Sequence, residues 1–261
     1  MNISTWQVPK HQIVELKRKS TKYCLCIPII NEGERFRAQL SKLKPYSNQI
    51  DVIICDGGST DGSTNEVFLK DQGVRTLLVK QDSGKLSAQL RMGYSYALSE
   101  GYEGVITIDG NGKDGVETVP RFIDKLDEGF DYVQGSRYAP GGEAINTPLL
   151  RHIANRFVHA PLLSLAAGYY WFTDTTNGYR AYSSKYLLDE RVQPFRNIFD
   201  TYELLAYLTV RASQIGLKVC QIPVRREYPK NEVPTKISFW KGNLNLIKIL
   251  ISCMFGTYNT K

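Results

Sequence analysis

The sequence has no long apolar run. A membrane-spanning helix needs roughly 18 to 20 consecutive apolar residues, and the nearest candidate, residues 244–255, is shorter and contains Lys248. Two interpretations of this segment stay open: a helix packed on the protein core, or an amphipathic segment that touches a bilayer, with Phe239 and Trp240 at its entry. No segment is of low complexity and no fixed period recurs, which excludes repeat architectures.

Residues typical of metal and redox sites are also few. The chain has five cysteines and three histidines. Cys24 and Cys26 form a C-x-C pair, but no second pair of Cys or His follows at zinc-site spacing. The cysteines lie mostly in apolar runs, where Cys behaves as a small hydrophobic residue. The N-terminal stretch lacks the apolar core of a signal peptide, and we therefore expect a protein of the reducing cytosol.

Acidic residues are fewer than basic ones. Lys and Arg number 33 against 26 Asp and Glu, which gives a formal net charge of +7 and a pI near 9.0. An excess of positive charge is compatible with three classes of partner: nucleic acid, an anionic membrane surface, or a phosphorylated small molecule. Charge alone does not choose among them.

The first two thirds of the chain alternates short apolar runs with helical patterns. Apolar runs typical of strands covered on both faces occupy residues 23–30, 50–56, 74–80, 104–109 and 131–137. Helical patterns lie between them at residues 33–44, 62–72, 84–99 and 116–128. This alternation predicts an α/β fold with a mostly parallel central sheet and helices on both faces.

Acids, bases and glycines collect where the predicted strands end. These positions are residues 31–34, 56–63, 81–85, 109–114 and 135–138. In an open parallel sheet, ligands bind beyond the carboxyl ends of the strands. A purely structural loop needs glycine or asparagine for its turn geometry, but it does not need an acid at the end of two different strands. We therefore predict that Asp56 and Asp109 belong to a binding site.

The pattern changes after residue 137. The predicted elements there are helices at 146–168 and 201–216, a loop with a short strand at 173–183, and a strand followed by a basic turn at 217–229. We divide the chain into an N-terminal extension (residues 1–21), one α/β domain (residues 22–236) and a C-terminal amphipathic helix or tail (residues 237–261).

Five sequence blocks point to a family. They are "IPIINEGE", "IICDGGSTDGS", "GKLSAQLRMGYSYALSEGYEGVITIDGNGKDGVETVPRFI", "GSRY" and "TTNGYRAYS". In this order they resemble the family-2 glycosyltransferases, and most closely the branch of dolichol- and polyprenyl-phosphate sugar synthases. The resemblance covers roughly residues 22–240. It implies a GT-A fold that binds a nucleotide-diphosphate sugar and transfers the sugar with inversion.

For the donor nucleotide, the resemblance implies that Pro28 and Glu32 line the base and ribose site and that Asp56 accepts a hydrogen bond from the base. An exposed carboxylate selects an N–H donor such as those of uracil or guanine, and the base stays undecided between these two. Asp56 can also cap the helix that follows it. We expect Lys85 near the diphosphate, because it lies at a helix start, where N–H groups and a cation both attract anions.

The segment "DGNGKDGVE" aligns with the family's block D-x-D-L-Q-D-x-x-E, which implies a Mg²⁺ or Mn²⁺ ion held against the diphosphate. Asp109 matches the first acid, but Asn111 replaces the second acid and Lys113 replaces the glutamine. Asn111 keeps a carbonyl oxygen for a metal, whereas Lys113 adds a positive charge and no ligand. We favour a weakened metal site on Asp109 and Asn111, because a unit charge stabilises a diphosphate less than a divalent ion does. Partial replacement of the metal by Lys113 is the alternative.

On the acceptor side, the resemblance implies a cationic site. Arg137 in "GSRY" and Arg151 match the family's pair that holds a lipid phosphate, and Lys236 in "TKIS" resembles its terminal lysine. With Asp109, these three are the expected catalytic residues. An arginine fork donates two parallel hydrogen bonds to a phosphate. A phosphate acceptor is ionised near neutral pH and needs no strong base.

The expected function is transfer of a sugar to a polyprenyl phosphate at the cytosolic face of a membrane, with anionic lipid and not nucleic acid as the surface partner. Relatives that use a hydroxyl acceptor carry a paired Glu-Asp as base, and this pair is absent, although Asp174, Asp200 and Glu203 lie in that region. Two alternatives stay open: transfer to a saccharide hydroxyl in cell-surface glycan synthesis, or a catalytically inactive nucleotide-sugar-binding protein, suggested by Asn111 and Lys113. The sequence names neither the sugar nor the oligomeric state.

Overall fold

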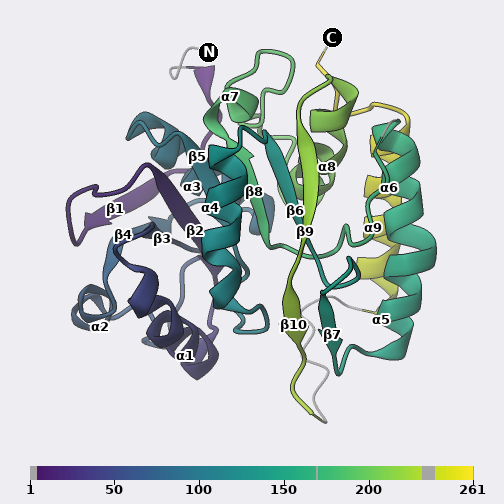
Figure 1. Ribbon diagram of the computed structural model, residues 1–261. Helices are drawn as coiled ribbons and strands as arrows, with labels where there is room; N and C mark the ends of the chain where they lie inside the picture. The colour runs from purple at the N-terminus through teal and green to yellow at the C-terminus, as the bar shows by residue number, and fades with distance from the viewer. Residues whose placement is uncertain (1–4, 169, 231–238, 261) are drawn as a thin grey trace.

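The centre of the fold is an eight-stranded sheet (Figure 1). The computed structural model describes residues 5–168, 170–230 and 239–260. From one edge to the other, the strands are β1 (His11–Glu15), β4 (Val74–Lys80), β3 (Asp51–Asp56), β2 (Tyr23–Ile29), β5 (Gly104–Thr107), β8 (Arg180–Ser183), β6 (Tyr132–Ser136) and β9 (Val219–Pro223). Only β1 and β8 run antiparallel to their neighbours in this sheet, so the prediction of a mostly parallel sheet is confirmed.

The five predicted strands correspond to β2, β3, β4, β5 and β6, with ends within two residues of the expected positions. Every residue of β2 and β3 is buried, because both faces of the sheet are covered. Alternate side chains enter opposite halves of the core: Cys24 and Cys26 pack on one side, and Leu25 and Ile27 on the other.

Strand β1 lies within the stretch that the sequence analysis assigns to an N-terminal extension. It pairs antiparallel with β4, from His11 opposite Lys80 to Glu15 opposite Thr76. Its residues are exposed or half-buried, as is usual at the edge of a sheet. Residues 11–15 are therefore part of the central sheet.

Helices cover both faces of the sheet. On one face lie α1 (Gly33–Leu43), α2 (Glu66–Asp71) and α4 (Val119–Asp127), with the short 3₁₀ turns η2 (Lys44–Tyr46) and η3 (Val116–Thr118) beside them. On the other face lie α3 (Leu86–Ser99), α7 (Ser184–Leu187) and α8 (Glu203–Gln214). The helices predicted in the first two thirds of the chain are confirmed, although α2 and α4 are shorter than expected.

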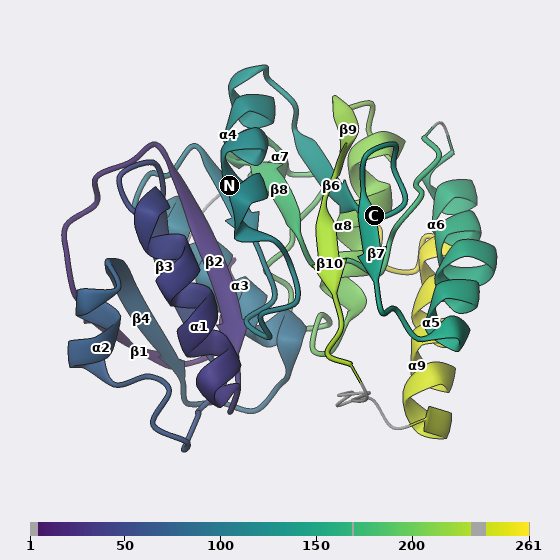
Figure 2. The ribbon, with the colours of Figure 1, turned by 60° about the horizontal axis from the view of Figure 1, so that its bottom comes forward.

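The helix predicted over residues 146–168 consists of three segments: α5 (Leu149–Ala154), a π-helical turn η4 (Asn155–His159) and α6 (Ala160–Ala167). β7 (Glu143–Ile145), which precedes them, and β10 (Arg225–Glu227) form a separate two-stranded parallel sheet. Figure 2 shows this small sheet between the central sheet and the α5–α6 unit. It brings residues from two distant parts of the chain to the same end of the molecule.

The C-terminal helix α9 (Phe239–Met254) packs against α6 and α8 (Figure 2). Ile249, Leu250 and Cys253 are buried in the core, so the packed-helix interpretation is confirmed for this face. Ile251 and Met254 are exposed on the opposite side. Within the residues that the structure describes, no helix is both long enough and apolar enough to cross a membrane.

Candidate active site

A cavity of about 1010 Å³ lies at the carboxyl ends of β2, β3 and β5. Its wall combines residues that follow these strands with residues from α3, α5, α8, α9 and β10. Among the described residues, the charged side chains on the wall are five cations and two acids: Arg35, Lys85, Lys113, Arg151, Arg226, Glu32 and Asp109. A cavity of this size and charge suits a phosphorylated ligand.

Five of the six residues predicted to bind the donor line the cavity: Pro28, Glu32, Lys85, Asp109 and Lys113. Asp56 is not among the described residues on the wall. Its carboxylate is buried and accepts hydrogen bonds from the backbone N–H (2.9 Å) and the hydroxyl (2.6 Å) of Ser59. The structure therefore shows Asp56 capping the local turn. A hydrogen bond from the nucleotide base to Asp56 stays a prediction.

Gln89 on α3 is a site residue that the sequence analysis missed. Its side-chain Nε2 donates hydrogen bonds to the carbonyl oxygens of Ile29 (2.6 Å) and Cys55 (2.9 Å). These bonds join the ends of β2 and β3, where the cavity begins. A Cβ on Gly57 would lie 2.9 Å from the same nitrogen, so the glycine of "DGGST" leaves room for this amide. A single glutamine within a helix gives no sequence signal of such a role.

Arg226 on β10 binds the segment that carries Asp109. Its Nη2 lies 3.0 Å from Oδ2 of Asp109, and its Nη1 lies 2.5 Å from Oδ2 of Asp114. Asp114 and Arg226 also form an isolated β-bridge, and the backbone N–H of Glu227 donates to the carbonyl of Lys113 over 2.8 Å. Backbone and side-chain bonds together hold this segment against β10.

Lys113 lies beside the ring of Tyr228. Its Nζ is 4.9 Å from the ring centre, within the range of a cation–π contact. The residue is buried and lines the cavity. Burial and the nearby charge of Arg226 lower the pKa of Lys113. This wall therefore concentrates positive charge that a bound anion would stabilise.

The residues of the metal-binding block do not fit a resident divalent cation. One carboxylate oxygen of Asp109 is engaged by Arg226, and the other lies against Gly178, where a Cβ would be 2.3 Å away. The side-chain oxygen of Asn111 accepts the backbone N–H of Lys113 over 3.2 Å, and a lysine ammonium has no lone pair for a metal. Among the described residues, no group of three or more His, Cys, Asp or Glu is placed to hold a metal ion.

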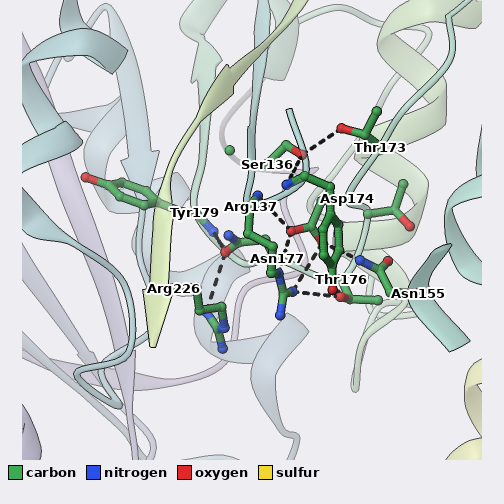
Figure 3. Close-up of polar contacts among 12 residues, drawn as sticks. Ser136, Arg137, Asn155, Thr173, Asp174, Thr176, Asn177, Tyr179 and Arg226 are labelled. Carbon is green, nitrogen blue, oxygen red and sulfur yellow. Dashed lines mark hydrogen bonds and ion pairs between the residues drawn. The ribbon is translucent and has the colours of Figure 1, made fainter. Parts of the chain in front are cut away.

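Arg137, at the end of β6, is buried in an ion pair with Asp174 (Figure 3). Its Nε lies 2.7 Å from Oδ2 of Asp174, and the two side chains are 1% and 0% exposed. Asn155, at the start of the π-helical turn, donates to Oδ1 of Asp174 over 2.8 Å, and Thr176 accepts from Arg137 over 3.0 Å. Arg137 is not among the described residues that line the cavity, and its ion pair with Asp174 holds it in the protein interior.

Arg151 on α5 lines the cavity, as expected of a phosphate-binding residue. Its Nη1 donates a hydrogen bond to the phenol oxygen of Tyr228 over 3.1 Å. Burial raises the pKa of Tyr228, but the charges of Arg226, Arg137 and Arg151 outweigh this effect and lower the pKa to about 8. The predicted acceptor residue Lys236 lies outside the described residues.

The carboxylates predicted in the acceptor region are engaged or lie off the cavity wall. Asp174 is held in its ion pair, and Glu203 accepts the backbone N–H of Asp200 over 3.0 Å. Asp200 is exposed and is not among the described residues that line the cavity. The acids that do line it, within the described part of the chain, are Glu32 and Asp109. Neither is one of the acids that the sequence analysis names in the acceptor region.

A mostly parallel sheet with a cationic cavity at its strand ends is the arrangement in which open α/β folds bind phosphorylated ligands. The model of the glycosyl transferase family 2 matches residues 24–189. The match spans more than half of the chain, and the protein belongs to this family of glycosyltransferases.

Several relatives act on lipid phosphates, as their names state. The polyprenol monophosphomannose synthase of Mycolicibacterium smegmatis is 28% identical over 211 residues, which cover 79% of this chain and 78% of that protein. The undecaprenyl-phosphate mannosyltransferase of Micrococcus luteus is 28% identical, with 76% and 80% covered. The dolichyl-phosphate hexose transferase of Haloferax volcanii is 27% identical, with 74% and 82% covered. The resemblance to this branch is confirmed.

Solved structures agree on the fold. The glucosyl-3-phosphoglycerate synthase of M. tuberculosis superposes with a TM-score of 0.67 at 17% identity, covering 90% of this chain and 81% of that chain. The same enzyme in complex with Mn²⁺, UDP and glucosyl-3-phosphoglycerate gives a TM-score of 0.60 at 18% identity, with 90% and 80% covered. At such low identity the likeness establishes the fold alone, and the predicted GT-A fold is confirmed.

Proposed function

We propose that this glycosyltransferase moves a sugar, with inversion, from a nucleotide-diphosphate donor to a polyprenyl phosphate. The observation that carries the proposal is the composition of the cavity wall, where, in the described part of the chain, five cations outnumber two acids. A donor diphosphate and an acceptor phosphate both need positive charge. A phosphate oxygen that is already ionised attacks the sugar without help from a base.

Residues from different parts of the chain are available for the two substrates. Pro28 lies at the end of β2 and Lys85 at the start of α3, and the side chain of Lys85 adds positive charge for the diphosphate. Arg151 comes from α5, on the other side of the molecule (Figure 1). We assign the acceptor phosphate to Arg151. Inversion requires this phosphate to attack the anomeric carbon from the side opposite to the leaving diphosphate.

The helix that carries Arg151 also offers a surface for a lipid chain. We define the apolar helix face as the exposed apolar residues of the consecutive segments α5, η4 and α6, namely Leu149, Leu150, Ile153, Phe157, Val158 and Leu165. Leu149 and Phe157 are each 72% exposed. Extended exposed apolar surfaces mark contacts with membranes or partners. A polyprenyl phosphate at a membrane surface matches both the arginine and the apolar face, and supports a peripheral membrane location.

The test compares the variant Arg151→Met with the control Arg121→Met. Arg121 is exposed on α4 and is not among the described residues that line the cavity. UDP- and GDP-sugars are incubated with undecaprenyl phosphate in vesicles, and sugar transfer is measured. We expect transfer by the wild type and by the control, and a loss of roughly tenfold or more in kcat/KM for Arg151→Met. Transfer to a saccharide hydroxyl that survives Arg151→Met unchanged would contradict the phosphate acceptor.

A further inference from the structure

We propose that Arg226 and Lys113 take the place of a divalent cation at the donor diphosphate, and that Asp109 and Asp114 serve to hold Arg226 there. The inference rests on the proposed function, because it concerns the diphosphate of the nucleotide donor. A solved structure with the same fold contains Mn²⁺ with UDP. In this chain, the segment after β5 carries Asn111 and Lys113 beside Asp109.

The position of Arg226 is the first observation. Its guanidinium bridges the two carboxylates, at 3.0 Å from Asp109 and 2.5 Å from Asp114, and still lines the cavity. A planar guanidinium suits this arrangement, because its several N–H donors point in different directions. Held in place from behind, the side chain is preorganised and loses little freedom when an anion binds.

The second observation is the loss of metal ligands. Oδ2 of Asp109 already accepts from Arg226, and a divalent ion on that oxygen would lie beside the guanidinium and be repelled. Asn111 directs its oxygen to the backbone N–H of Lys113. Lys113 stands where the family's block has a glutamine, so a positive charge takes the place of a neutral metal ligand. A metal would therefore find few free oxygens and two like charges at this place.

The third observation is the amount of charge. Arg226 and Lys113 both line the cavity and both lie against Tyr228, at 5.7 Å and 4.9 Å from its ring centre. Together they supply the two positive charges that a divalent cation would supply. A single lysine provides half of that charge, so the buried arginine is what makes a complete replacement chemically reasonable.

The experiment is calorimetric binding of UDP and of GDP to the full chain, in excess EDTA and again with Mn²⁺, together with electron paramagnetic resonance of Mn²⁺ added alone. We expect at least one nucleotide to bind with a Kd that differs by no more than about threefold between the two conditions. We also expect no protein-bound Mn²⁺ signal. Binding that is lost in EDTA and restored by Mn²⁺ would overturn the inference while leaving the nucleotide donor in place. Absence of binding under both conditions would overturn the donor assignment and this inference together.

Variants give an independent readout. Lys113→Gln should weaken nucleotide binding in EDTA by roughly tenfold or more, whereas Lys125→Gln, a partly exposed lysine on α4 paired with Glu128, should not. The double variant Asn111→Asp with Lys113→Gln restores the family's ligand types and should make nucleotide binding stronger with Mn²⁺ than with EDTA. Arg226 itself is not substituted, because it is buried and its loss can unfold the chain. The variants at Lys113 and Asn111 therefore test whether the cations replace the metal. Unchanged affinity in Lys113→Gln would contradict the inference.

Discussion

Arg151 and Tyr228 are joined by a hydrogen bond of 3.1 Å from the guanidinium to the phenol oxygen. Nη1 of Arg137 lies 3.5 Å from the same oxygen, and Lys113 and Arg226 lie against the tyrosine ring. One side chain thus contacts the cation proposed for the acceptor and the two cations proposed for the donor. Because Tyr228 contacts all of these cations, it sets the distance between the bound acceptor phosphate and the donor diphosphate. Sugar transfer depends on that distance.

Tyr228 predicts a loss of activity at alkaline pH. Although burial opposes ionisation, the surrounding arginines lower the pKa of Tyr228 to about 8. Below this pH the phenol is neutral, and above it the phenolate offsets one of the positive charges that attract phosphate. We expect kcat/KM of the wild type to fall as the pH rises through about 8, and this fall to be absent in Tyr228→Phe. The measurement is a profile of kcat/KM over a range of about pH 6.5 to 9.5.

A second tyrosine serves as the control for this profile. Tyr46 lies in η2, and it is not among the described residues that line the cavity. Tyr46→Phe should keep the alkaline fall in kcat/KM. The same fall in Tyr228→Phe would show that another group titrates there and would contradict the assignment.

The ion pair of Arg137 and Asp174 predicts a large loss of stability for Asp174→Asn. Both side chains are buried, and removal of one partner leaves a buried charge without compensation, which costs about 3–5 kcal/mol in the free energy of unfolding. Urea unfolding measures this cost. As a control, Asp189→Asn breaks an ion pair with the exposed Arg191 and should cost no more than about 1 kcal/mol.

A double variant separates the charge effect from the packing effect. Arg137→Met combined with Asp174→Leu removes both charges and should recover part of the stability that Asp174→Asn loses. If Asp174→Asn has the same midpoint urea concentration of unfolding as the wild type, the ion pair does not stabilise the fold.

The central strands could be predicted from the sequence because both of their faces are buried, which leaves continuous apolar runs such as "YCLCIPII". Strand β1 could not be predicted. Its five residues, HQIVE, are exposed or half-buried at the sheet edge, and only the pairing with β4 makes them a strand. The interruption of the helix at Asn155 was missed for a similar reason, because the bond from Asn155 to Asp174 depends on tertiary structure.

The candidate site could be predicted where a strand end places the residue directly. Pro28, Glu32, Lys85 and Asp109 lie on the cavity wall for this reason. The pairing of Asp109 with Arg226 joins residues 117 positions apart. No local pattern contains that information, because it arises from the bridge between β10 and the segment after β5.

The apolar helix face predicts binding to membranes. Leu150 and Phe157 are largely exposed on the segment that carries Arg151. Burying a large apolar side chain contributes about 1.5–3 kcal/mol, so Leu150→Asp and Phe157→Asp should each weaken binding to phosphatidylglycerol vesicles by roughly tenfold or more. Val67→Asp, at a similarly exposed position on α2, is the control and should bind as the wild type does. Vesicle flotation measures the bound fraction. Equal losses in all three variants would assign the effect to added negative charge and contradict a specific membrane-binding face.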